Sequence, residues 1–173
     1  MSGPPASTPY TQPGGTAVSS AGINTHRDWL NFHRNFHGFL GQQITTMQAF
    51  TAATQAVVNL DAVGFDTEGG SITNGWQCPW DGYWRVGGRI HLPAGTGSMN
   101  LSVFDLHGTT DAALLSTDGA LHPSYPVTLA VPPEPIYISA LDHVTLRFIC
   151  SANVTAALAS GGAATLSISW AGQ

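Results

Sequence analysis

From about residue 50 onward, apolar residues recur at every second position in short runs separated by Gly, Pro, Asp and Asn. A period of two residues is typical of β-strands with one buried face. The runs cover residues 56–65, 82–92, 99–108, 126–131, 134–140, 143–152 and 164–172. No helical pattern lies between them, which predicts an all-β sandwich or barrel over residues 49–173. Long connections such as 108–126 favour a Greek-key or jelly-roll path over a meander.

The run 82–92 shows the clearest alternation. One face carries Trp84, Val86, Gly88, Ile90 and Leu92, and the other carries Tyr83, Arg85, Gly87, Arg89 and His91. We expect the first set to line the core because it is apolar apart from one glycine. The second set faces either solvent or, through Tyr83 and the two arginines, a neighbouring subunit.

Residues 23–48 show a helical period instead. Thr25 followed by Asp28 is a plausible helix start, and steps of about 100° gather the large apolar side chains on one half of the cylinder. The pattern predicts one amphipathic helix that serves as a stalk or a docking element, either in a short coiled coil or against a neighbouring surface. The predicted partner-binding residues of the helix and the segment before it are Tyr10, Trp29, Phe32, Phe36, Phe39 and Leu40.

Residues 1–22 contain four prolines, four glycines and many small polar residues. Such a segment buries too little apolar surface to order itself. We therefore expect an extended anchoring arm that a partner holds in place.

Composition excludes several classes of protein. The chain has five arginines, no lysine and a formal net charge of −5, which does not match a basic nucleic-acid-binding surface. No run approaches the roughly 18 apolar residues of a membrane span. With only 9% charged residues, the surface consists mostly of small polar side chains, which suits packing against other subunits. Cys78 and Cys150 lie in apolar runs that favour buried thiols, although pairing between them stays open.

Residues for catalysis or metal binding are sparse. His33 and His37 are four residues apart, with His26 further back, so a shared metal is conceivable, but histidines that donate hydrogen bonds at an interface are favoured. The only glutamates are Glu68 and Glu134, and the aspartates stand singly in turn contexts. We expect no catalytic residues, no cofactor and no enzymatic activity.

A candidate ligand-binding loop combines Trp76, Trp80, Asp81 and Tyr125. Aromatic rings beside a carboxylate suit the apolar faces and hydroxyl rims of sugars. The alternative, packing of the tryptophans in a core or an interface, is favoured because tryptophan is usually largely buried.

The order of these segments resembles the jelly roll of tumour necrosis factor and complement globular heads. The residues that carry the resemblance are 57–66, the stretch "CPWDGYWRVGGRIHL" at 78–92, "IYISALDHVTLRF" at 136–148 and the closing run 164–170. Asp142-His143 stands where that family more often has Gly-Asp.

The resemblance implies a sandwich that assembles as a homotrimer, with the segment 23–48 as its stalk. The arm, the aromatic helix and the small β domain are also similar to small virion proteins of tailed bacteriophages. We therefore expect a minor tail or capsid decoration protein, assembled in the host cytoplasm and docked to other virion proteins through residues 1–48. The alternative is a jelly-roll module that binds a host glycan or receptor.

Overall fold

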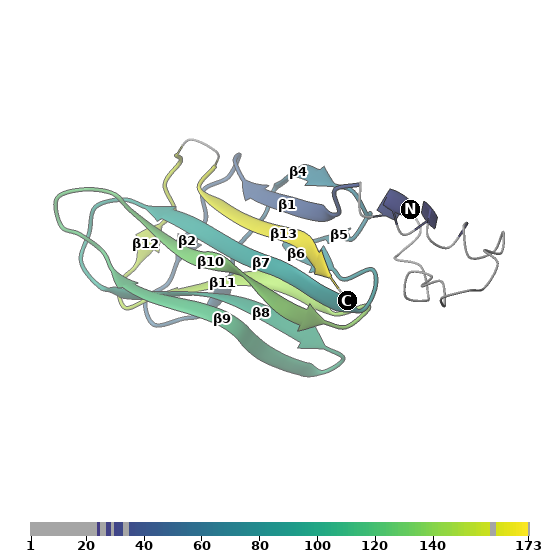
Figure 1. Cartoon of the computed structure of the whole chain (residues 1–173). Coiled ribbons are helices and arrows are strands. Elements are labelled where there is room, and N and C mark those ends of the chain that lie inside the picture. Colours follow the sequence, from purple (N-terminus) through teal and green to yellow (C-terminus); the bar gives the residue numbers. More distant parts are fainter. Residues whose placement is uncertain (1–23, 25–26, 29, 33–34, 160–161, 173) are drawn as a thin grey trace.

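The computed structural model describes residues 24, 27–28, 30–32, 35–159 and 162–172. The described chain is almost entirely β-structure (Figure 1). Its strands are β1 (Gly38–Gln43), β2 (Ala49–Phe50), β3 (Ala56–Val57), β4 (Ala62–Asp66), β5 (Ser71–Ile72), β6 (Gly75–Gln77), β7 (Gly82–Leu92), β8 (Ser98–His107), β9 (Thr110–Ala120), β10 (Val127–Ile138), β11 (His143–Cys150), β12 (Val154–Thr155) and β13 (Ala164–Gly172).

The strands form two main antiparallel sheets. The first sheet has the order β10-β7-β13-β1-β4, and the second has the order β5-β6-β11-β8-β9, with β3 also paired to β11. Strands β2 and β12 form a separate short ladder. Apart from the consecutive pairs β5-β6 and β8-β9, neighbouring strands come from distant parts of the sequence. The chain therefore crosses between layers as a jelly roll does, which confirms the predicted architecture (Figure 1).

The core lies between the sheets and explains why the alternating runs become strands. Trp84, Val86, Ile90 and Leu92 of β7 are fully buried, whereas Tyr83, Arg85 and Arg89 are exposed, as the period-two pattern predicts. Inner side chains of β8, β11 and β13 fill the same core, namely Leu101, Val103, Val144, Leu146, Phe148, Leu166 and Ile168. Gly87 differs from the prediction because it is buried on the outer face.

A bulge in β10 covers Gly87. The register of β10 against β7 shifts between Val131 and Glu134. A Cβ atom at Gly87 would lie 3.0 Å from the backbone of Pro133, so glycine allows the two strands to approach at this point. The bulge also joins the two predicted runs 126–131 and 134–140 into a single strand.

The predicted helix over residues 23–48 is wrong in its second half. Of the described residues, only 24, 27–28 and 30–32 are helical, and Gly38–Gln43 is strand β1. Strand β1 pairs with β13 on one side and β4 on the other, and this pairing outweighs a helical spacing interrupted by Gly38 and Gly41. The sandwich therefore begins at β1 and not at residue 49. Residues 1–22 lie outside the described residues.

The long connection predicted at 108–126 contains a strand. Strand β9 pairs with β8 along its whole length, from Thr110 opposite His107 to Ala120 opposite Ser98. Its sequence is rich in Ala, Ser, Asp and Gly, residues that favour strands weakly. As the edge strand of the second sheet it has one partner, so little apolar alternation marks it in the sequence.

Gln43, at the end of β1, is an unpaired polar side chain in the core. It is fully buried, and neither its amide nitrogen nor its amide oxygen has a hydrogen-bond partner among the described residues. Burying an unpaired amide costs about 1–3 kcal/mol. We expect Gln43→Met to raise the free energy of unfolding in urea by about 1 kcal/mol or more.

The same substitution at Gln48 is the matched control. The Gln48 amide donates to the carbonyl of Val57 and accepts from the backbone N–H of Asn59. Gln48→Met removes both hydrogen bonds, so we expect it to lower stability. Equal effects of the two substitutions would contradict this account of Gln43.

Candidate functional site

The outer face of the first sheet carries large aromatic side chains in contact with solvent. Tyr83 of β7 stands directly opposite Tyr137 of β10, and their rings meet edge to face with centroids 5.5 Å apart. Tyr83 is 47% exposed and Tyr137 is 54% exposed. Arg85 follows Tyr83 on the same face and stands opposite Pro135.

A row of outward-facing residues crosses the middle of this face. Gly87 of β7, Ser167 of β13, Leu40 of β1 and Phe65 of β4 stand opposite one another across four strands, so they share one face. Gly87 is covered by the β10 bulge, whereas Ser167 is partly exposed.

A second aromatic pair lies at the other edge of the same face. Phe36 is 58% exposed and Phe65 is 39% exposed, and their rings meet edge to face at 5.3 Å. A Cβ atom at Gly38 would lie 2.9 Å from the Phe36 ring, which shows that the ring lies over the sheet. We call Phe36, Phe65, Tyr83, Tyr137 and Arg85 the aromatic face.

Sequence reasoning found this face only in part. The alternation in residues 82–92 identified Tyr83 and Arg85, whereas Tyr137 and Phe65 carry no signal that separates them from core aromatics. Their exposure follows from strand register, which comes from pairing between distant segments.

The predicted partner-binding residues lie in different environments. Phe39 lies in the core at 1% exposure, which corrects its assignment, because β1 turns its side chain inward. Leu40 is half-buried on the outer face beside Phe65, and Phe36 is exposed. Tyr10 and Trp29 lie outside the described residues.

Phe32 packs on its own sandwich, which corrects its assignment as a partner contact. It is 7% exposed, stacks on His37 at 4.1 Å, and meets the rings of Trp80 and Trp170 edge-on at 5.8 Å each. These contacts attach residues 30–32 to one end of the sandwich.

A buried ion pair supports that attachment. The His37 ring donates from Nε2 to the carbonyl of Phe32 at 2.9 Å, while Nδ1 lies 2.5 Å from Oε1 of Glu68. Because a carbonyl only accepts, Nε2 carries a hydrogen, and the second contact requires one more proton between Nδ1 and Oε1. Both ring nitrogens of His37 are therefore engaged. His26 and His33 lie outside the described residues.

The predicted ligand-binding loop does not form one site. Trp76 is fully buried, its ring packing on Trp84 at 4.8 Å, and this corrects its assignment as an exposed platform. Trp80 is half-buried against the core and contacts Trp84 and Trp170.

Asp81 and Tyr125 lie at opposite ends of the sandwich. Asp81 precedes β7 and accepts a hydrogen bond from the backbone N–H of Ala140. Tyr125 precedes β10 near the far end of β7, where it is 54% exposed and stacks on His122 at 3.5 Å. The length of β7 separates the two, about 30 Å at the usual rise of a strand.

A group of titratable side chains gathers between β8 and the β10–β11 turn. Burial, followed by the nearby Asp142 carboxylate, raises the pKa of Asp105 to about 6. Asp142 is buried, and its carboxylate contacts His107 at 2.6 Å and accepts from the backbone N–H of Ser139. Burial also raises the pKa of the Cys78 thiol to about 12, with the charge of Asp142 adding to the effect. Cys78 therefore stays a neutral thiol at physiological pH.

Asp105→Asn should stabilise the protein at neutral pH. Because the pKa of Asp105 is raised to about 6 from an ordinary value of 3.8, the folded state retains a proton between about pH 4 and about pH 6 that the unfolded state has lost, and above this range it holds an unfavourably placed charge. The Asp105 contribution to stability thus falls as pH rises from about 4 to about 6 and is level above that. Solvent screens a half-buried carboxyl, so we expect Asp105→Asn to gain about 1 kcal/mol at pH 7.

Urea unfolding at several pH values checks this prediction. The advantage of Asp105→Asn over the wild type should shrink below pH 6 and vanish near pH 4. A gain in stability that does not change with pH would show that it does not come from the ionisation of Asp105.

Other predicted features have the following outcomes. Cys78 and Cys150 are both free and buried, as the apolar context favours. Within the described part of the chain, no group of three or more His, Cys, Asp or Glu side chains is arranged to hold a metal ion. No helix in that part is long and apolar enough to cross a membrane.

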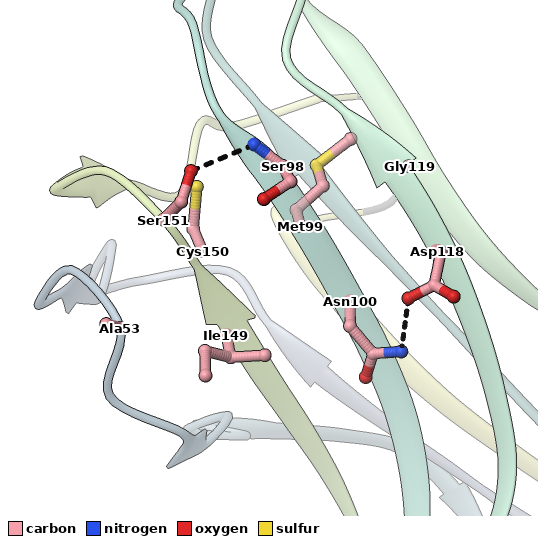
Figure 2. A pocket seen from close by; sticks show the side chains of 9 residues that line it. All are labelled: Ala53, Ser98, Met99, Asn100, Asp118, Gly119, Ile149, Cys150 and Ser151. Atoms are coloured by element: carbon pink, nitrogen blue, oxygen red, sulfur yellow. Dashed lines mark hydrogen bonds between the residues drawn. The ribbon is translucent and has the colours of Figure 1, made fainter.

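The second sheet carries a cleft that sequence reasoning missed. It has a volume of about 340 Å³ and lies over β8, β9 and the end of β11, with Asn100 and Asp118 among the residues that line it (Figure 2). No local motif marks it, because its residues come from three strands and a loop.

Comparison with solved structures defines the class of fold. The chain is similar to murine APRIL in a crystal structure at pH 5.0, with a TM-score of 0.63 and 9% identity over 79% of this chain and 100% of that one. It is also similar to the Eiger TNF from S. frugiperda, with a TM-score of 0.62 and 9% identity over 80% of this chain and 94% of that one. The protein thus has a tumour-necrosis-factor-like jelly roll. No protein-family model and no curated protein matches the sequence.

Proposed function

We propose that the protein is a non-enzymatic structural component of a bacteriophage virion, a minor tail or capsid decoration protein, in which three copies associate through the aromatic face. The observation that carries the proposal is the pair of exposed aromatic clusters at opposite edges of the first sheet. Large exposed apolar groups gathered on one face mark interaction surfaces. The trimer is the assembly implied by the tumour-necrosis-factor resemblance.

The chemistry of the aromatic face suits self-association. Tyrosine and arginine are the residues most enriched where binding energy concentrates, and Tyr83, Tyr137 and Arg85 lie together. The serines of β13 between the clusters are small and uncharged, which permits close contact. A specific interface buries roughly 800 Å² on each partner, and one face of a five-stranded sheet is of that order.

The virion role also involves the segment before the sandwich. We propose that the part of residues 1–48 that precedes β1 docks to other virion proteins, with the Pro- and Gly-rich residues 1–22 as the arm. Leu30 supports this role because it is 45% exposed before the chain enters the sandwich, whereas Phe32 and Phe39 pack internally.

The virion role is tested with phage particles from the source host. Particles banded in a density gradient should contain peptides of this chain in proportion to infectious titre, and antibodies should label intact particles. Peptides found only in the soluble fraction of lysed cells would contradict the proposal.

A second candidate function is attachment to a host glycan. It is favoured by the cleft on the second sheet, which lies on the opposite side of the sandwich from the aromatic face. A trimer built through the aromatic face would leave the cleft open, so the two functions are compatible.

A further inference from the structure

The cleft on the second sheet is small enough for a compact ligand. Its volume of about 340 Å³ falls at the lower end of the range typical for small-molecule sites. Ile149 of β11, Asn100 of β8 and Asp118 of β9 stand opposite one another, so an apolar side chain, an amide and a carboxylate form one row across three strands (Figure 2).

The polar pair in this row is held in one orientation. The buried Ser102 hydroxyl donates to Oδ1 of Asn100 at 2.5 Å. This contact fixes the amide so that Nδ2 points to Asp118, where it donates to Oδ1 at 2.9 Å. Asn100 therefore keeps one N–H for a ligand, and Asp118 keeps Oδ2 as an acceptor.

The rest of the cleft supplies apolar contact and a hydrogen-bonded backbone. Ile149 and Ala53 line one side of it. At its end, the Ser151 hydroxyl accepts a hydrogen bond from the backbone N–H of Ser98 at 2.9 Å. A ligand in the cleft thus meets hydrocarbon on one side and the Asn100–Asp118 pair on the other.

An N–H donor beside a carboxylate acceptor selects the class of ligand. A simple cation offers no acceptor for the Asn100 N–H, and a simple anion is repelled by Asp118. Two neighbouring hydroxyls of a sugar match the pair, because one donates to the carboxylate and the other accepts from the amide. The C–H face of the same ring then packs on Ile149.

We propose that the cleft binds one neutral hexose unit of a glycan through Asn100, Asp118 and Ile149. The proposal rests on the attachment function given above as the second candidate, and it places that function on the second sheet instead of the tryptophan loop.

Saturation-transfer NMR on the full chain tests the proposal, with D-glucose, D-galactose, D-mannose and N-acetylglucosamine as separate probes. At least one sugar should receive saturation from the wild type. Asp118→Asn and Asn100→Ala should each weaken its binding about tenfold or more, since each removes one of the two polar partners. Glu134→Gln, which removes a carboxylate on the other sheet, should leave binding unchanged.

Three outcomes would overturn the assignment: no sugar in contact with the wild type, binding that both cleft variants retain, and acetamide displacing the sugar more strongly than other sugars do. The last would show that the pair binds a peptide-like amide. The molecular mass of the protein is measured in the same samples, which separates failure of sugar binding from failure of the assembly. A trimer that binds no sugar would contradict the sugar site and leave the proposed assembly intact.

Discussion

Tyr83→Lys is expected to convert the proposed trimer into monomers. The substitution puts an ammonium group two residues from Arg85 on the aromatic face and removes the ring that contacts Tyr137. Truncating an interface tyrosine that is a hot spot costs about 2 kcal/mol or more, and a buried charge without a partner adds to that cost. Because each copy contributes the same residue, the loss occurs at every interface of the trimer.

Tyr125→Lys is the matched control for this prediction. Tyr125 is as exposed as Tyr137, at 54%, but it lies outside the first sheet, in the segment before β10. We expect the control to keep the wild-type mass in sedimentation velocity while Tyr83→Lys shifts to the mass of one chain. The wild-type mass for Tyr83→Lys as well, with circular dichroism unchanged, would exclude Tyr83 from the interface.

Trp84→Ala is expected to cause the largest loss of stability of the protomer. Trp84 is fully buried, and its ring contacts those of Trp76, Trp80 and Trp170 at 4.8, 5.5 and 4.9 Å. Removing a large core aromatic side chain costs about 3–5 kcal/mol through lost transfer energy and the cavity left behind. We expect a variant that unfolds at much lower urea concentration or fails to fold.

Trp84→Phe provides a milder form of the same test. The indole nitrogen of Trp84 has no hydrogen-bond partner among the described residues, so its loss carries no penalty and only ring volume is reduced. The unfolding free energy of Trp84→Phe should lie between those of the wild type and Trp84→Ala. A loss as large as that of alanine would indicate that the indole nitrogen is bonded in the native protein.

Strong alternation made part of the fold predictable from the sequence. The predicted runs 82–92 and 164–172 coincide with β7 and β13, since both strands bury one face and carry strand-favouring residues. The jelly-roll class followed from the number and order of such runs. The helix over 23–48 failed because apolar residues spaced for a helix also fit a strand, and only pairing with β13 and β4 decides between them.

The candidate site was less predictable because exposure depends on register. Phe39 and Phe65 are equally apolar in the sequence, yet one is 1% and the other 39% exposed. For Trp76 the favoured interpretation, packing in the core, is confirmed, since it lies in β6 against Trp84. Asn100 and Asp118 are 18 positions apart and meet only because β9 pairs with β8. The pair was not predictable because the sequence of β9 lacks a clear strand pattern.

The most direct test of the central claim is the mass of the full-length chain in solution, measured by sedimentation equilibrium over a range of concentrations. An assembly of three copies through the aromatic face predicts one species with three times the chain mass of 18.1 kDa. A single species of 18.1 kDa at every concentration would contradict it.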